Sequence, residues 1–253
     1  VNEGGRVFNV VSGSIANGVY KSAATETQAG AFGLFYPDLG LILLNAIKTE
    51  LTGGMFQTNW FKRFKTKITT ELNDDGYYVD NEYIITENET IRADAVSKYA
   101  TVDLATSTKE QADFTVVTIA GITPKNNVLI FEIFRKRLEA PDIIPALKKF
   151  LEQYNLDYIG IEKAGFQLAL IQIAKREGLP VRELKADRDK ISRAMPLSAR
   201  MEQGQVHFKE NVLWFDELER ELLQFPEGEH DDQVDSLAYA ILESQRLKKW
   251  FAY

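Results

Sequence analysis

Three carboxylates lie within five positions near the end of the chain, in the run Asp231-Asp232-Gln233-Val234-Asp235. The apolar run 237–242 that follows predicts a helix, on which Asp232 and Asp235 share a face. Like charges on one helix face raise the cost of ionising each other, so an ordinary core helix has no use for them. A divalent cation removes that cost and prefers carboxylate oxygens. The run therefore predicts a site for Mg²⁺ or Mn²⁺.

Two further acids lie in predicted strands. Asp103 lies in the otherwise apolar run 99–105, and Glu162 closes the apolar strand predicted for 157–162. A buried carboxylate needs a partner, which can be a Lys, an Arg or a metal ion. For any one of these acids alone, a cap, an ion pair or a strand end is the commoner explanation. Because open α/β sheets bind ligands outside the carboxyl ends of their strands, the three placements together predict one shared site.

The elements that position these acids follow from hydrophobic periodicity. The first strands are predicted over 98–105, 114–122 and 128–134, with a hairpin turn at 124–127. After them, helices and strands alternate, with helices over 141–154, 166–177, 190–203, 212–224 and 231–249 and strands over 157–162 and 181–184. Three antiparallel strands followed by such alternation predict an α/β fold, with a mixed central sheet and helices on both faces.

The segments before this region have weaker patterns. A basic amphipathic helix is predicted over 58–72, a strand over 77–86 and a polar connector over 87–97. Residues 1–54 are rich in Gly, Ser, Ala, Thr and Asn. A piece that short predicts a linker or a cover over the sheet more than an independent function. The expected division is an N-terminal extension, 1–54, and one domain, 55–253.

Composition excludes several kinds of chemistry. The 253 residues contain no cysteine, which excludes disulfides, thiolate catalysis and Cys-ligated metal clusters. No apolar run approaches the roughly 20 residues of a membrane span, and no signal-peptide pattern is present, so no membrane partner is expected. The net charge of −7 argues against a nucleic-acid binder. Local charge matters more, however, where carboxylates serve a metal site.

The segment 175–200 is basic within this acidic chain, because it holds eight Lys or Arg and four Asp or Glu. It is either a solvated surface of mixed charge or a surface that contacts a DNA backbone. The segment alone leaves both interpretations open.

The acids in this order resemble the ribonuclease H-like nucleases, and more narrowly the C-terminal nuclease domain of the phage terminase large subunit. The resemblance rests on the segments 101–105, 112–117, 161–162, 165–167 and 230–239, with matching spacers at 189–194 and 221–226 and a matching lead-in at 56–61. It covers about 55–245 and leaves 1–54 without a counterpart. The joint pattern is specific although each motif alone is not.

The resemblance implies phosphodiester hydrolysis with two Mg²⁺ or Mn²⁺ ions about 3.5–4 Å apart, one generating hydroxide from bound water and the other stabilising the leaving 3′ oxygen. Asp103 is expected to bridge the ions, flanked by Glu162, Asp232 and Asp235, and these four are the expected catalytic residues. Asp231 lies about 100° round the helix from Asp232 and is a weaker metal candidate. No other cofactor is expected.

The resemblance also implies contacts with double-stranded DNA. Basic residues near the same edge are expected to hold its backbone without reading sequence, namely Lys163, Lys185, Arg188, Lys190, Arg193 and Arg200. Asp113 either approaches the site or begins the adjacent strand, and the strand start is favoured. His230 either touches phosphate or the metal shell or enters the helix, and helix entry is the commoner role. Further implied partners are an ATPase motor domain, a portal and a small terminase subunit, in the packaging machinery of the host cytoplasm. Since the usual motor domain is not in this sequence, the chain is expected to be a fragment that carries the nuclease half.

Three functions stay open at this point. The preferred one is a metal-dependent endonuclease that cuts concatemeric viral DNA during genome packaging. A junction resolvase resembling RuvC also ends in a helix-borne Asp-x-x-Asp, but the N-terminal material and the Phe166-Gln167 match favour the terminase. A non-catalytic DNA-clamping or assembly module would need no clustered carboxylates.

Overall fold

The structure is a computed structural model. It describes residues 54–104, 114–163, 167–185, 189–228 and 230–247, together with the backbone of six strands before them. The chain divides into two compact units, Val1–Met55 and Phe56–Tyr253. The strands of the first unit are β1 (Asn2–Glu3), β2 (Arg6–Val7), β3 (Asn9–Ala16), β4 (Val19–Ser22), β5 (Ala31–Tyr36) and β6 (Leu41–Leu44). Four of them form a sheet in the order β4-β3-β5-β6.

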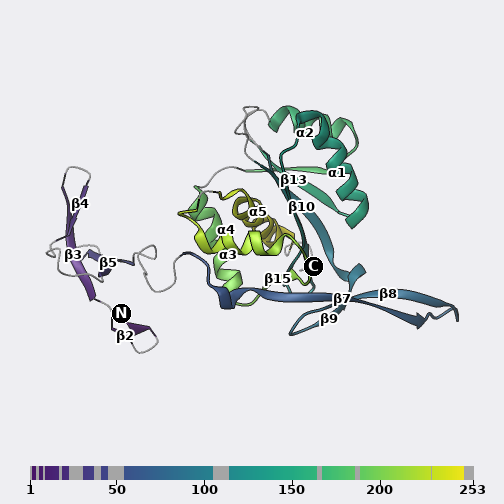
Figure 1. Cartoon of the computed structure of the whole chain (residues 1–253), viewed down its shortest axis with the longest axis horizontal. Helices are drawn as coiled ribbons and strands as arrows, with labels where there is room; N and C mark the ends of the chain where they lie inside the picture. Colours follow the sequence, from purple (N-terminus) through teal and green to yellow (C-terminus); the bar gives the residue numbers. More distant parts are fainter. Residues whose placement is uncertain are drawn as a thin grey trace. The chain divides into compact units, whose positions relative to one another are not determined.

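A mixed sheet is the scaffold of the second unit (Figure 1), with nine strands in the described part of the chain, in the order β14-β13-β10-β11-β12-β15-β7-β8-β9. Strands β10, β11 and β12 pair antiparallel, while β13 and β14 extend the sheet on one side by parallel pairing. On the other side β15 is parallel to both β12 and β7. The strands are β7 (Lys62–Leu72), β8 (Tyr78–Ile85), β9 (Thr90–Arg92), β10 (Ser97–Asp103), β11 (Thr115–Ile122), β12 (Val128–Lys136), β13 (Tyr158–Glu162), β14 (Val181–Leu184) and β15 (Val206–Lys209).

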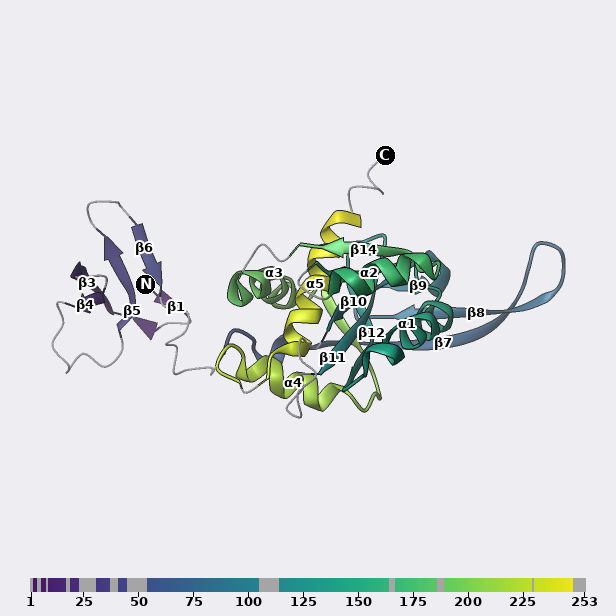
Figure 2. The same ribbon diagram turned by 90° about the horizontal axis from the view of Figure 1, so that it is seen from above.

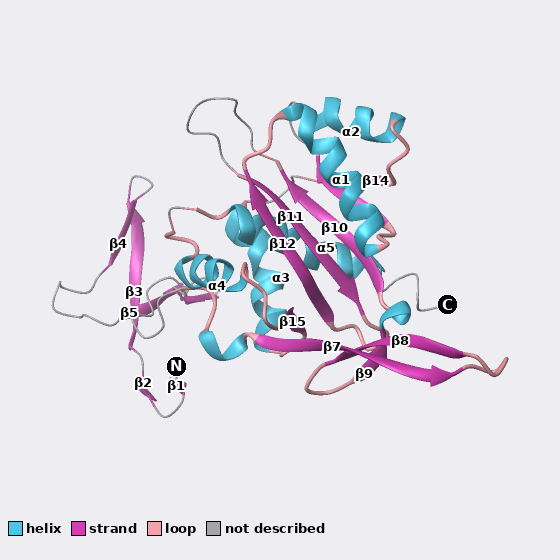
Figure 3. Ribbon diagram, turned by 45° about the vertical axis from the view of Figure 1, so that its right-hand side comes forward, coloured by secondary structure: helices cyan, strands magenta, loops and turns pink. Residues whose placement is uncertain are grey.

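Helices cover both faces of this sheet (Figures 2 and 3). On one face, Ala100 and Val102 of β10 belong to an apolar core with Leu147 of α1 and Leu170 of α2. On the other face lies α5, packed against β10 and β11, with α3 and α4 beside it. The helices are α1 (Ala140–Tyr154), α2 (Gln167–Arg176), α3 (Lys190–Glu202), α4 (Phe215–Gln224) and α5 (Asp232–Leu247). Over the described residues, no helix has the length and apolar character that crossing a membrane requires.

These central elements confirm the predicted mixed sheet with helices on both faces. The region before them differs. Residues 58–72 form a 3-10 turn (Thr58–Trp60) and strand β7, so the prediction of a helix there was wrong. The aromatic spacing suits a helix, but Ile68 is 67% exposed and joins no buried face. Several β-branched residues favour an extended chain, and β8 supplies backbone partners along most of β7.

Two short strands were not expected from the sequence. Strand β9 and a 3-10 turn (Ala93–Ala95) occupy the segment 87–97, which was predicted to be a connector. Strand β15 follows α3 and joins β12 to β7, so it links the hairpin β7–β8 to the central sheet. Both are short strands whose alternation is too brief to predict from a single sequence.

Candidate metal centre

Helix α5 is held against β10 by side chains on alternate strand residues. Tyr99 donates its hydroxyl to the carbonyl oxygen of Ala240 at 2.7 Å, and Thr101 donates to that of Ser236 at 2.8 Å. The strand and the helix run in opposite directions and advance by similar amounts, because two strand residues span roughly 6.6 Å and four helix residues roughly 6 Å. The two elements therefore stay in step from one pair to the next.

The next step along both elements leads to the acids. Asp103 follows Thr101 on the same face of β10, and the first turn of α5 carries Asp232 and Asp235. Strand β13 runs parallel to β10, and its register, continued by one residue, puts Glu162 beside Asp103. The four acids thus meet at the carboxyl ends of two neighbouring strands, next to the start of α5.

The charges of these acids act on one another. Burial, followed by the charges of Asp235, Glu162 and Asp232, raises the pKa of Asp103 to about 8, although Arg193 opposes the rise. Burial also raises the pKa of Asp235 to about 6, again against the charge of Arg193. Mutual repulsion of this kind requires the carboxylates to lie near one another. Without a bound cation, a site of this composition holds a proton on Asp103 at neutral pH.

A guanidinium lies among the acids. Arg193 of α3 is 8% exposed, with Nε 3.2 Å from Asp235 Oδ1 and Nη1 3.6 Å from Glu162 Oε1. Its Nη1 also donates to the hydroxyl of Tyr239, which donates to Glu162 Oε1 at 2.8 Å. Sequence reasoning missed Tyr239, although its place one turn after Asp235 on the same helix puts both on one face. Arg193 and Tyr239 together hold the two carboxylates.

The side chains as they stand do not enclose a metal ion. Across the part of the chain that the structure describes, no group of three or more His, Cys, Asp or Glu is arranged to hold one. Two of the four acids, Glu162 and Asp235, instead lie beside the guanidinium of Arg193. The donor chemistry still fits a hard cation, since all four side chains offer carboxylate oxygens. Asp235 Oδ1 is buried and has no hydrogen-bond partner among the described residues. Asp103, Glu162, Asp232 and Asp235 would supply the oxygen ligands of such an ion.

Asp231 lies at the edge of this cluster. Its carboxylate accepts two hydrogen bonds from Lys190 Nζ, at 2.6 and 2.7 Å. Its charge still contributes to the raised pKa of Asp235. The structure therefore gives Asp231 a lysine partner, whereas Asp232 begins the helix.

A carboxylate from another helix caps the start of α5, and sequence reasoning missed it. Glu221 of α4 is 7% exposed. It accepts hydrogen bonds from the backbone N–H of Gln233 at 2.7 Å, from that of Val234 at 3.1 Å and from Gln233 Nε2 at 2.6 Å. It thus satisfies N–H groups that a helix start leaves unpaired, and its charge suits that helix end. The available signal was an acid on an apolar helix face, between Leu218 and Leu222.

Three of the basic residues predicted for DNA contacts are at the surface. Lys185 is exposed, and the side chains of Lys163 and Lys190 are 53% and 56% exposed. Lys163 pairs with Glu183 at 2.8 Å. Lys163 and Lys175 together lower the pKa of Glu183 to about 2. Arg188 lies outside the residues that the structure describes.

The other two basic residues, Arg193 and Arg200, are buried. Arg193 belongs to the acidic cluster. Arg200 is 7% exposed and donates to Ser244 Oγ at 2.7 Å, to Gln205 Oε1 at 3.2 Å and to the carbonyl oxygen of Asn126. Its guanidinium thus connects α3 with α5 and the turn after β11, and its role is in packing. A basic residue on the inner face of a helix looks the same in sequence as one on its outer face.

Asp113 and His230 were the two remaining residues considered near the site. Asp113 lies outside the described residues. His230 is exposed, and its ring packs edge-on against Phe114 with centroids 5.9 Å apart. The structure thus gives His230 a contact before the start of α5, as expected of a residue at the entry of a helix.

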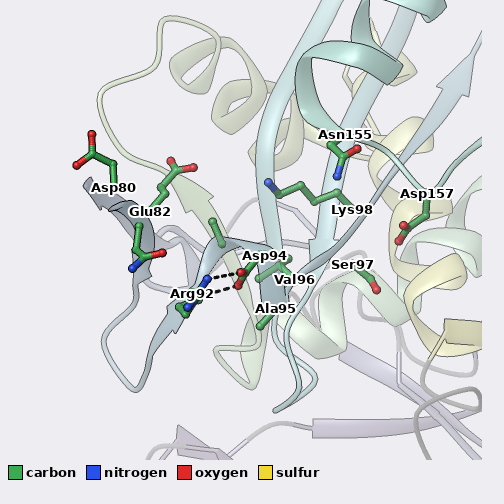
Figure 4. Close-up of a pocket in the computed structure, with 12 residues that line it drawn as sticks. Asp80, Glu82, Arg92, Asp94, Ala95, Val96, Ser97, Lys98, Asn155 and Asp157 are labelled. Carbon is green, nitrogen blue, oxygen red and sulfur yellow. Dashed lines mark hydrogen bonds and ion pairs between the residues drawn. The ribbon is translucent and has the colours of Figure 1, made fainter. Parts of the chain in front are cut away.

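A separate cleft of about 690 Å³ lies at the other end of β10 (Figure 4), where Arg92 pairs with Asp94 at 2.6 Å. Ser97 lines this cleft, whereas Asp103 ends the same strand roughly 20 Å away. The cleft therefore does not belong to the acidic cluster. Its lining residues are Asp80, Asn81, Glu82, Arg92, Ala93, Asp94, Ala95, Val96, Ser97, Lys98, Asn155 and Asp157.

Comparisons with known proteins agree with this architecture. The family model of the terminase RNaseH-like domain matches residues 100–244. The large terminase nuclease of the thermophilic phage G20c with bound cobalt has a TM-score of 0.51 at 19% identity, covering 76% of this chain and 97% of that chain. The same nuclease with bound magnesium has a TM-score of 0.48 at 21% identity, covering 58% and 82%. The human cytomegalovirus terminase nuclease domain has a TM-score of 0.43 at 15% identity, covering 58% and 82%.

No curated protein matches the chain. The likeness to the cobalt-bound phage nuclease concerns the fold. Together with the family match, it confirms the predicted ribonuclease H-like α/β sheet. All four acids of the cluster fall within the matched range.

Proposed function

The chain belongs to the family of terminase RNaseH-like domains, and on this premise we propose that residues 55–253 form a metal-dependent endonuclease. Its substrate in this proposal is concatemeric viral double-stranded DNA, cut during genome packaging. The observation that carries the proposal is that Asp103 and Glu162 end neighbouring strands beside the first turn of α5, where the charges of Asp235, Glu162 and Asp232 help to raise the pKa of Asp103. Four mutually repelling carboxylates are costly without cations, and a module that only clamps DNA has no use for them.

In this proposal Asp103, Glu162, Asp232 and Asp235 would hold two Mg²⁺ or Mn²⁺ ions, with Asp103 as the ligand shared by both. Bound there, such ions would supply an activated water and would stabilise charge on the leaving oxygen. The chain itself orients the ligands, because the hydroxyl of Tyr239 donates to Glu162. The burial of Asp103 and Asp235 limits water around the reacting phosphate and so strengthens its electrostatic interactions.

The DNA contacts of this proposal come from exposed cations near the cluster. Lys163 directly follows Glu162, Lys190 pairs with Asp231, and Lys185 follows β14 at the same edge of the sheet. Ammonium groups there attract the phosphate backbone in any sequence. An ATPase motor domain, a portal and a small terminase subunit remain proposed partners. Residues 1–54 remain a proposed N-terminal extension.

A plasmid-cleavage assay tests the proposal. Supercoiled plasmid is incubated with the protein and Mn²⁺ or Mg²⁺, with and without a chelator, and with four-way junctions as competitors. We expect nicked and linear products that the chelator abolishes and that excess junction does not suppress. Binding of duplex without cleavage under either metal would favour a clamping module instead. Cleavage confined to the junctions would favour a resolvase.

A further inference from the structure

Arg193 is a buried cation whose contacts are with the acids of the cluster and with Tyr239. It is 8% exposed and comes from α3, whereas its two acidic neighbours come from β13 and α5. Unlike a lysine, an arginine keeps its charge in any protein environment. The cluster therefore contains a permanent positive charge beside Glu162 and Asp235.

The contacts of this guanidinium differ in quality. Its Nη1 donates a hydrogen bond to the Tyr239 hydroxyl, and its carbon lies 4.7 Å from the centre of the Tyr239 ring. With Asp235 the guanidinium forms an ion pair but no hydrogen bond. Nε and Oδ1 are 3.2 Å apart, yet neither atom has a hydrogen-bond partner among the residues that the structure describes. An aligned Arg–carboxylate pair is considerably stronger than this one. The tyrosine is thus the anchor, and the aspartate contact is the one that is easily exchanged.

We propose that Arg193 is the resident counter-ion of the metal-free site and gives up its contacts with Glu162 and Asp235 when divalent cations bind. This inference rests on the proposed function, since it concerns the same acids. It makes Arg193 a positioning residue: it keeps the carboxylates together before metal arrives, while Tyr239 keeps the guanidinium nearby afterwards. An exposed phosphate contact does not suit a side chain with so little accessible surface.

The proposal fixes the direction of two effects. Without metal, removing the guanidinium leaves buried carboxylates uncompensated, which destabilises the fold. With metal, the same removal takes away a positive charge that repels the ion, which strengthens binding. Both effects increase the stabilisation that a metal ion gives, because a ligand stabilises the folded state according to its affinity.

The decisive experiment compares Arg193→Gln with Arg200→Gln. Arg200 is a matched control, since it lies on the same helix, is equally buried and also contacts α5, but donates to Ser244, Gln205 and a backbone carbonyl. Thermal unfolding is followed in chelator and over a Mn²⁺ titration, and bound Mn²⁺ is counted independently by electron paramagnetic resonance. We expect Arg193→Gln to lower the half-saturating Mn²⁺ concentration about tenfold. We expect Arg200→Gln to lower the melting temperature by the same amount with and without Mn²⁺. Its half-saturating Mn²⁺ concentration should equal that of the wild type.

Equal Mn²⁺ affinity in both variants would overturn the inference while leaving the proposed function intact. A wild-type protein that binds no Mn²⁺ would overturn both. If Arg193→Gln is unfolded with and without Mn²⁺, Arg193→Lys decides the question. Lysine keeps the charge but lacks the planar fork that reaches two carboxylates, so its half-saturating Mn²⁺ concentration should fall about two- to threefold. A wild-type value for Arg193→Lys would then count against the inference.

Discussion

Thr101 and Ser236 exchange hydrogen bonds in both directions between β10 and α5. The Thr101 hydroxyl donates to the Ser236 carbonyl oxygen at 2.8 Å, and the Ser236 hydroxyl donates to the Thr101 carbonyl oxygen at 3.1 Å. Both residues are fully buried, and the Thr118 hydroxyl lies 2.9 Å from that of Ser236. Because Asp103 is two residues from Thr101 and Asp235 is next to Ser236, this double contact sets how the strand and helix acids face each other.

Replacing Ser236 by alanine tests that relationship. The change removes the hydroxyl that bonds the Thr101 carbonyl, and we expect the free energy of unfolding to fall by about 1–3 kcal/mol. Urea denaturation measures the loss. Thr70→Ala is the control, since its hydroxyl bonds Asp80 at an exposed site and its removal should change stability by less than about 0.5 kcal/mol. Equal effects in the two variants would mean that the buried contact does not hold α5 in place.

Asp103→Asn should abolish cleavage without unfolding the protein. The amide keeps the shape of the side chain and removes the charge proposed to bridge two cations, so plasmid cleavage should fall at least about a hundredfold. Asp157→Asn is the control, because Asp157 is exposed just before the other end of β13. Circular dichroism checks that both variants are folded. Retained cleavage by Asp103→Asn would rule out its assigned role.

The stability of the chelated protein should fall as pH rises. The pKa of Asp103 is about 8 in the folded state against an ordinary 3.8, so the folded state keeps a proton that the unfolded chain has released. Stability from this group is complete below about pH 4 and is lost as pH rises towards about 8. Melting temperatures in chelator between about pH 5 and about pH 8 measure the trend. Asp103→Asn should make the melting temperature less dependent on pH. Saturating Mn²⁺ should oppose the fall of the melting temperature with pH, because the metal binds the ionised carboxylates. A chelated wild type whose melting temperature falls no more with pH than that of Asp103→Asn would contradict this assignment.

Glu221→Gln tests the cap on α5. The amide offers one acceptor oxygen where the carboxylate offers two, and its NH₂ group would face Gln233 Nε2. We expect a loss of about 1–3 kcal/mol in the free energy of unfolding, because Gln233 Nε2 loses its acceptor and the two backbone N–H groups keep only a neutral one. The matched change Glu217→Gln, on the same helix, alters a side chain that is 54% exposed and should cost less than about 1 kcal/mol. Guanidinium denaturation distinguishes the two, and similar losses would remove the special role of Glu221.

Lys163→Ala should weaken DNA binding at every sequence. Removing one phosphate contact lowers the slope of log affinity against log salt by about one. Fluorescence anisotropy with a short duplex measures that slope, in an Asp103→Asn background that prevents cleavage. Lys148→Ala is the control, because the Lys148 side chain is 43% exposed and is also paired with a glutamate, Glu177. A salt slope equal to that of Lys148→Ala would exclude Lys163 from the DNA contacts.

The sequence predicted the elements whose periodicity is long and regular. Helices over 190–203 and 231–249 and the strand over 157–162 agree closely with α3, α5 and β13. The segment 58–72 failed because its aromatic spacing fits a helix, whereas pairing with β8 decides its conformation. Strand pairing is a long-range interaction that periodicity within one segment does not contain.

The candidate site was predictable in its acids and not in its surroundings. Asp103, Glu162 and the two aspartates of α5 stand out because charge in an apolar context needs a reason. Arg193, Tyr239 and Glu221 do not stand out, since each lies in a segment where such residues are ordinary. Their contacts depend on how α3, α4 and α5 pack against one another. The residue pattern of a helix predicts which of its faces is buried, but not which side chains of other elements that face contacts.

The similar advance of β10 and α5 per contact also limits how relatives of this chain can vary in length. One residue inserted between Asp232 and Ala240 would turn one part of the helix about 100° against the other and lengthen it by about 1.5 Å. Either Tyr99 and Thr101 would lose their acceptors or the aspartates would leave the strand end. The turn at 73–77, between β7 and β8, has no such constraint. Aligned relatives should therefore show gaps at that turn and none across 232–240.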